Sequence, residues 1–169
     1  MAPPISISQW RLRYDRIDLA ITHWLARTGP VVLRLGLGVV FFWFGILKFF
    51  PGLSPAQDLA TRTVDQLTFG AVGPELSLPL LAGWETLIGL GLLSGRFLRP
   101  TLLLLAVQMV GTATPLILFP SETFTRFPLA PTLEGQYILK NIVLIGGAMV
   151  IGATVRGGGL VDEPTRPSS

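Results

Sequence analysis

The chain has 169 residues, of which half are apolar and only 14% are charged, against roughly 25% in soluble domains. Its mean hydropathy is +0.59. This composition excludes a disordered chain and argues against a soluble globular domain, and the length leaves room for about four membrane-spanning helices of roughly 20 residues each. The chain has no Cys and a single His, which excludes disulfides, thiolate metal sites, iron–sulfur clusters and bis-His haem within this one chain.

Residues 1–29 are predicted to form an amphipathic segment at the membrane interface. Residues 1–8 lack the apolar core and cleavage site of a signal peptide. From about Ser8 to Thr28, apolar residues recur at helical spacing on one face, and several are the aromatic residues that favour the membrane interface: Trp10, Tyr14, Ile17, Ile21 and Trp24. Gly29-Pro30 is expected to break this pattern and to start the first span.

We predict an all-α integral membrane four-helix bundle over residues 30–156, with spans at about 30–50, 75–93, 100–119 and 135–155, followed by a polar tail over 157–169. Ser54-Pro55-Ala56-Gln57 has the pattern of a helix N-terminus with a capping box, which predicts a short surface helix over about 55–68 on the outer side. The connection between the last two spans is apolar and contains prolines, so it is expected to lie on the membrane surface or to cap the bundle.

The basic residues indicate how the bundle is oriented. The net charge is +3, and the basic residues flank apolar runs, which is the pattern of a topology signal rather than of nucleic-acid binding. The side of the membrane that holds both termini would carry eight Lys or Arg, and the other side would carry three, namely Lys48, Arg62 and Arg126. The excess predicts that both termini lie in the cytoplasm.

Each predicted span has one polar or small face, and these faces are expected to converge in the bundle interior. The candidate ligand-binding or intramembrane polar residues on them are Arg34, Lys48, Glu85, Gln108, Thr112, Lys140 and Asn141. Charges inside a membrane cost roughly 2.5–3.5 kcal/mol each at the centre, and Glu85 is the deepest of them. A pair of Glu85 with Arg34 or with Lys140 is expected, and both bases together would leave a net +1 that could attract a carboxylate, an anionic lipid headgroup or a quinone carbonyl.

Purely structural roles for the same residues are an alternative to ligand binding. Arg34 and Lys140 are close enough to the interfaces to extend their charges into the headgroup layer, and Lys48 fits the role of such an anchor at the outer end. Glu85 fits a purely structural ion pair, a ligand or proton site, or a protonated and hydrogen-bonded acid. Gln108 and Thr112 fit interhelical hydrogen bonds as well as ligand contacts. No metal site is predicted.

Two segments carry a family resemblance. R-L-G-L-G-V-V-F-F-W-F-G-I-L-K-F (Arg34 to Phe49) and W-E-T-L-I-G-L-G-L-L-S-G-R (Trp84 to Arg96) resemble the first two helices of the DoxX family, and E-G-Q-Y-I-L-K-N (Glu134 to Asn141) resembles the last helix of a DoxX-like branch related to YkgB-type membrane proteins. The resemblance implies a small four-helix protein of the bacterial cytoplasmic membrane, with some relatives linked to oxidoreductase systems such as a thiosulfate–quinone oxidoreductase and an oxidative-stress complex.

The leading expectation for function is therefore an accessory membrane subunit that binds a quinone or lipid-like molecule for an oxidoreductase partner. Membrane lipids are the expected surroundings, and a homo-oligomer stays open. The alternative is a small transporter or proton-conducting protein that uses Glu85. A stand-alone enzyme is disfavoured, because the sequence has no Ser-His-Asp set, and its Gly157–Gly159 run follows a helix instead of opening one as a phosphate-binding loop does.

Overall fold

The computed structural model describes residues 7–50, 52–54 and 56–159, with side chains from Tyr14 onward. The elements within these residues are α1 (Ile7–Leu47), α2 (Gln57–Leu67), α3 (Pro74–Ser94), α4 (Leu98–Ala113), α5 (Pro115–Leu118), α6 (Pro120–Thr123), β1 (Phe124–Arg126), β2 (Ala130–Pro131) and α7 (Leu133–Thr154). Four helical stretches are long and apolar enough to cross a membrane: Tyr14–Leu47, Pro74–Ser94, Leu98–Leu118 and Leu133–Thr154. The predicted all-α fold with four spans is confirmed.

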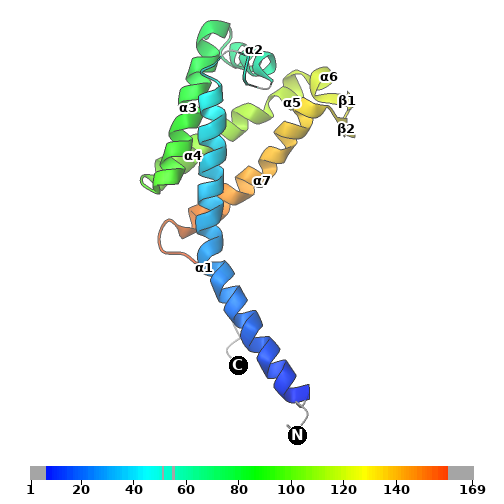
Figure 1. The fold of residues 1–169 in the computed structure, drawn as a ribbon. Coiled ribbons are helices and arrows are strands. Elements are labelled where there is room, and N and C mark those ends of the chain that lie inside the picture. The colour runs from blue at the N-terminus through cyan, green and yellow to red at the C-terminus, as the bar shows by residue number, and fades with distance from the viewer. Residues whose placement is uncertain (1–6, 51, 55, 160–169) are drawn as a thin grey trace, which may run out of the picture.

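The first helix does not end where the sequence pattern predicts. α1 runs unbroken for 41 residues and contains Pro30, whereas the sequence pattern suggested a separate segment ending at Gly29. Proline removes one backbone donor and bends a helix, but the residues on both sides of Pro30 still form helical turns. Figure 1 shows that α1 changes direction part-way and that its N-terminal half projects beyond the other helices. The side chain of Trp10, predicted to lie on the apolar face, falls outside the described side chains.

The closest helix pair is α1 with α3, and Figure 1 shows that the two helices run antiparallel. A Cβ atom on Gly89 would lie 2.4 Å from the backbone nitrogen of Phe42, and a Cβ atom on Gly45 would lie 2.6 Å from the backbone nitrogen of Thr86. No real side chain fits in these spaces. The two glycines therefore allow the backbones to approach directly, as small residues do between helices in a membrane.

α4 and α7 complete the bundle around a small apolar core. The buried side chains of this core are Leu37, Phe41, Ile88, Leu92, Leu105, Met109 and Ile151. α7 contributes little to it, and most of its apolar side chains are exposed in the isolated chain, such as Val143 at 74% and Met149 at 71%. Apolar side chains that face outward on a spanning helix are expected to contact lipid.

One end of the bundle carries all the short elements. Figure 1 shows α2, α6 and the β1–β2 hairpin at this end, which we call the outer end, and the α3–α4 turn with the last turns of α7 at the opposite, inner end. α2 forms where a surface helix was predicted and buries Leu59 and Thr63. The connection after α5 forms α6 and an antiparallel hairpin, and Thr132 caps α7 by accepting a hydrogen bond from the backbone nitrogen of Gly135.

The N-cap residue of α2 lies two positions after the predicted Ser54. It is Ala56, whose φ of 55° is left-handed and whose own side chain makes no capping hydrogen bond. The side-chain oxygen of Gln57 accepts a hydrogen bond from the backbone nitrogen of Gly52 at 3.2 Å. Gln57 thus holds the preceding loop, as a capping-box glutamine does, but it reaches a residue further back than Ser54.

Candidate functional site

Glu85, which the sequence places deepest in its span, belongs to a closed polar cluster formed by α3, α4 and the turn that follows α1. The Nζ atom of Lys48 lies 2.6 Å from Oε2 of Glu85, and the side-chain nitrogen of Gln108 donates to Oε1 of Glu85 at 2.9 Å. Glu85 is 8% exposed and Gln108 is 7% exposed. Both carboxylate oxygens therefore have a partner, and the negative charge is neutralised within the bundle.

The contact between α1 and α3 decides which base reaches Glu85. Gly45 packs against Glu85 and Thr86, whereas Gly38 packs against Leu93, almost two turns further along α3. Lys48 follows Gly45 by three residues, so its long side chain reaches back to the carboxylate. The expected pairs of Glu85 with Arg34 and with Lys140 are both wrong in this structure, and Lys48 is the partner rather than an interfacial anchor.

Arg34 stabilises the inner end of α3 instead. Its guanidinium donates to the backbone oxygens of Leu92 and of Leu93, the latter at 3.3 Å, and it lies against Gly95, the left-handed residue that ends the helix. The last carbonyls of a helix have no partner within the helix and form the negative end of its dipole. Arg34 supplies both hydrogen bonds and positive charge at that end.

Of the remaining predicted residues, Thr112 and Asn141 form an interhelical contact, and Lys140 is an exposed base. The side-chain nitrogen of Asn141 donates to Oγ1 of Thr112 at 3.3 Å, which links α7 to α4. Lys140 is exposed, and its Nζ lies 5.2 Å from the centre of the Tyr137 ring, a distance typical of a cation–π contact. Lys140 therefore lies on the exposed side of α7.

A second polar region lies at the outer end, and the sequence analysis did not propose it as a site. Arg62 of α2 makes a two-pronged contact with Glu122 of α6, and its guanidinium lies 4.9 Å from the centre of the Phe119 ring. The hydrogen bond with Arg62 lowers the pKa of Glu122, and the same bond raises the pKa of Arg62. The two residues lie in separate connections, and no spacing in the sequence relates them.

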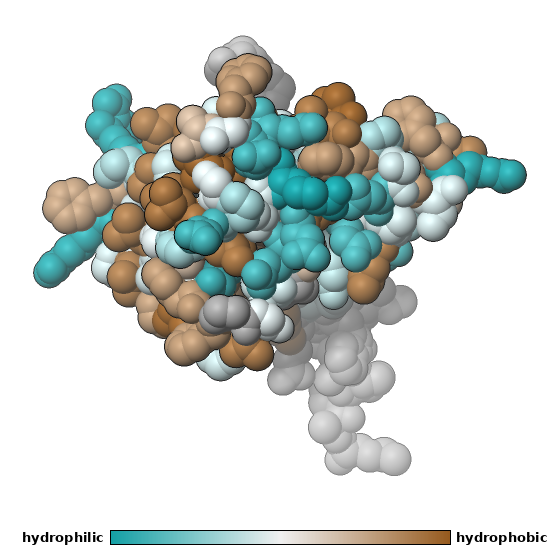
Figure 2. Space-filling view, turned by 90° about the horizontal axis from the view of Figure 1, so that it is seen from above, coloured by the Kyte–Doolittle hydropathy of each residue, from teal (hydrophilic) through white to brown (hydrophobic). Residues whose placement is uncertain are grey.

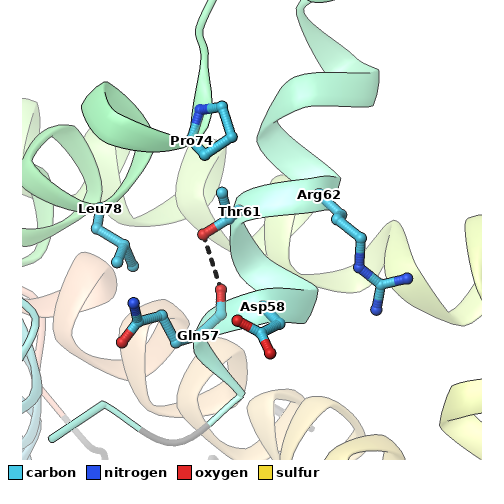
Figure 3. Close-up of a pocket in the computed structure, with 6 residues that line it drawn as sticks. All are labelled: Gln57, Asp58, Thr61, Arg62, Pro74 and Leu78. Carbon is cyan, nitrogen blue, oxygen red and sulfur yellow. Dashed lines mark hydrogen bonds between the residues drawn. The ribbon is translucent and has the colours of Figure 1, made fainter. Parts of the chain in front are cut away.

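Two open hollows flank α2 beside this ion pair. The first, of about 460 Å³, lies between α2 and the start of α3 and is lined by Gln57, Asp58, Thr61, Arg62, Pro74 and Leu78. Figure 3 shows Leu78 and the Gln57 side chain pointing toward each other across it, with Thr61 bonded to the backbone oxygen of Gln57 at 2.9 Å. The second, of about 770 Å³, extends from α2 to Glu122 and Glu134.

The surroundings of these hollows are amphipathic. In Figure 2, which looks onto the outer end, hydrophilic side chains gather near the centre of the face and apolar side chains form much of its rim. The first hollow has polar groups from α2 on one side and Pro74 and Leu78 of α3 on the other. Such a lining suits a molecule with a polar head and an apolar tail. Among the described residues, no group of three or more His, Asp or Glu is placed to hold a metal ion.

The comparison with known families identifies the chain. Residues 29–119, from Gly29 to the end of the third span, match the family described as DoxX. The chain belongs to the DoxX family. This match and the four apolar helices make it a multi-pass membrane protein, and Lys48, Glu85 and Gln108 all lie within the matched segment. No curated protein and no solved structure matches the chain.

Proposed function

We propose that this DoxX protein is a non-catalytic accessory subunit located in a bacterial cytoplasmic membrane, with both termini in the cytoplasm. In this role it holds a quinone or a lipid-like molecule for an oxidoreductase partner. The observation that carries the proposal is the amphipathic hollow between α2 and α3. Its volume of about 460 Å³ is in the range of sites that bind small ligands. It also lies beside the spanning helix α3, along whose surface an apolar tail could extend.

The chemistry of the lining supports a neutral or weakly polar headgroup. Gln57 and Thr61 offer hydrogen-bonding groups, and Arg62 is already engaged by Glu122. A quinone carbonyl or a lipid ester can accept a hydrogen bond from the side-chain nitrogen of Gln57 without bringing a full charge, whereas the hydroxyl of Thr61 already donates to the backbone oxygen of Gln57. The buried Glu85 cluster contributes to this function by holding α1, α3 and α4 together, since its members are partnered with one another.

The test is copurification after mild solubilisation, with mass spectrometry of the extracted lipids and bound proteins. Leu78→Trp should fill the hollow and remove the bound quinone or lipid. Leu80→Trp is the matched control, because Leu80 is on the same helix and is 57% exposed but does not line the hollow. Absence of quinone, specific lipid and partner protein from the unmodified chain would overturn the proposal, as would equal retention by the two variants.

The contacts of Glu85 argue against the alternative of a proton carrier. Protonation of the carboxylate would give up its ion pair with Lys48 and leave that ammonium group unpaired and 14% exposed, which is costly inside a bundle. A proton flux in reconstituted vesicles that Glu85→Gln abolishes while leaving the fold intact would instead support the carrier.

A further inference from the structure

The first helix is longer than the bilayer that it crosses. At about 1.5 Å per residue, the 41 residues of α1 extend roughly 60 Å, about twice the hydrocarbon thickness of a membrane. The bundle reaches only to about Leu33 of α1, which packs near Gly147 of α7, while Arg34 meets the end of α3. Figure 1 shows the part of α1 that precedes the bundle projecting beyond the other helices at the inner end, so a bilayer of ordinary thickness that covers those helices leaves this part outside its hydrocarbon core.

This part of α1, residues 14–28, is called the arm here, and one of its faces is apolar. The side chains on this face are each more than half exposed: Tyr14, Ile17, Ile21, Trp24 and Leu25. They recur at intervals of three and four residues and so form a single stripe along the helix. A straight arm would hold this stripe in water, which soluble surfaces rarely do over so many neighbouring residues.

The charges in and just before the arm favour an anionic surface. Within the arm two Arg are balanced by two Asp, and Arg11 and Arg13 directly before it give residues 11–28 a surplus of two positive charges. By helical spacing, Arg16 and Arg27 lie away from the apolar stripe, so both can remain in water when the stripe is buried. Tyr and Trp on the apolar side suit the level of the lipid headgroups.

The chain has a place to bend between the arm and the span. Pro30 lies inside α1 and provides no backbone donor, and a Cβ atom on Gly29 would have no neighbour within 4 Å. No other element therefore packs against the Cβ side of Gly29. Oγ1 of Thr28 already bonds to the backbone oxygen of Trp24 at 2.7 Å, a local contact that often bends helices.

We propose that the arm turns at Gly29–Pro30 and lies along the bilayer surface at the inner end, with its apolar stripe in the interface and its arginines on anionic lipid headgroups. The bilayer is favoured over a protein partner because the arm is covalently joined to a span, so the membrane surface is always within its reach. The apolar stripe matches the apolar part of the membrane interface, and the surplus of arginine matches the anionic headgroups.

The chain has no Cys, so a single introduced Cys can carry a bimane fluorophore at a defined position. Ile17→Cys places the probe on the stripe, and Leu19→Cys is the matched control on the opposite side of the helix, at similar exposure. The full chain is placed in nanodiscs of phosphatidylcholine with phosphatidylglycerol, which leave both membrane faces accessible. We expect iodide to quench the probe at position 17 about fivefold less than at position 19, and nitroxide-labelled lipid to quench it more.

Equal iodide quenching at the two positions would overturn the proposal, because a projecting arm exposes both sides to water. Protection at position 17 without quenching by labelled lipid, accompanied by disulfide-linked dimers of the unlabelled Ile17→Cys chain, would assign the stripe to a second copy and overturn it as well. Nanodiscs of phosphatidylcholine alone separate the lipid chemistries. Weaker protection there supports the anionic headgroups, and unchanged protection would contradict that part of the proposal. Circular dichroism confirms that both variants remain helical.

Discussion

The Nζ atom of Lys48 and Oε2 of Glu85 are 2.6 Å apart, and this contact joins the outer end of α1 to the middle of α3. Removing one partner of a buried ion pair is expected to cost about 3–5 kcal/mol, because the other charge is left without compensation. Lys48→Met should therefore lower the free energy of unfolding, measured by titration with sodium dodecyl sulfate in mixed micelles, by about that amount.

Lys140→Met provides the control, since Lys140 is exposed on α7 and its loss should have little effect. The double variant with Glu85→Gln should recover part of the loss caused by Lys48→Met. If Lys48→Met proves as mild as Lys140→Met, the ion pair does not stabilise the bundle.

A second prediction concerns the contact of α1 with α3. Gly89→Ala would place a Cβ atom 2.4 Å from the backbone nitrogen of Phe42, so the helices must separate. Overpacking of this kind costs about 1–3 kcal/mol or more. Gly83→Ala is on the same helix, has no neighbour within 4 Å of its Cβ, and should be neutral or slightly stabilising. The same unfolding titration distinguishes them, and equal behaviour of the two variants would contradict the close packing.

A third prediction uses a buried hydroxyl. Oγ1 of Thr86 is buried and has no hydrogen-bond partner among the described residues, which is unfavourable in a bundle interior. Thr86→Val keeps the shape and removes the hydroxyl, so the free energy of unfolding should rise by about 1 kcal/mol. Thr112→Val should lower it, because Oγ1 of Thr112 accepts a hydrogen bond from Asn141 and donates one to the backbone oxygen of Met109. Loss of stability in both variants would show that Thr86 has a partner.

The fourth prediction concerns pH and the outer ion pair. The pKa of Glu122 lies below its ordinary 4.5 because of the hydrogen bond with Arg62. A carboxyl whose folded pKa is lowered adds stability above its unfolded pKa and loses it as the pH falls through the folded value. The contact between α2 and α6 should therefore weaken only below about pH 4.5, seen as a rise in distance between labels on Asp58→Cys and Ser121→Cys. The Glu122→Gln variant should lack this acid step, and an unchanged step there would assign it to another group.

The sequence predicts the class of the fold well and the partners of its charges poorly. Long apolar runs separated by Pro and Gly suffice to locate the spans, and the depth of Glu85 follows from its place in the second run. Its partner depends on how far α1 is shifted along α3, which is set by the spaces at Gly45 and Gly89. Those glycines are visible in the sequence, but which one opposes which residue is not.

The outer end shows the same limit in another form. The helix α2 is predictable from its local pattern, whereas the contact of Arg62 with Glu122 brings together two connections 60 residues apart. The continuity of α1 through Pro30 has a local cause that the sequence pattern does not reveal. A proline usually ends a helix in sequence analysis, but here apolar residues continue on both sides of Pro30, and the helix continues with them.

The order of residues along the chain would allow the Lys48–Glu85 contact to form during synthesis. Lys48 directly follows the first span and Glu85 belongs to the second, so both partners are present before α4 has been made, and Gln108 follows them in the chain. A lone carboxylate would oppose insertion by roughly 2.5–3.5 kcal/mol on translocon-based scales. If α1 and α3 move from the translocon into the lipid as one hairpin, the carboxylate enters the bilayer with its counter-charge, and the glycine contacts between the two helices guide that early assembly.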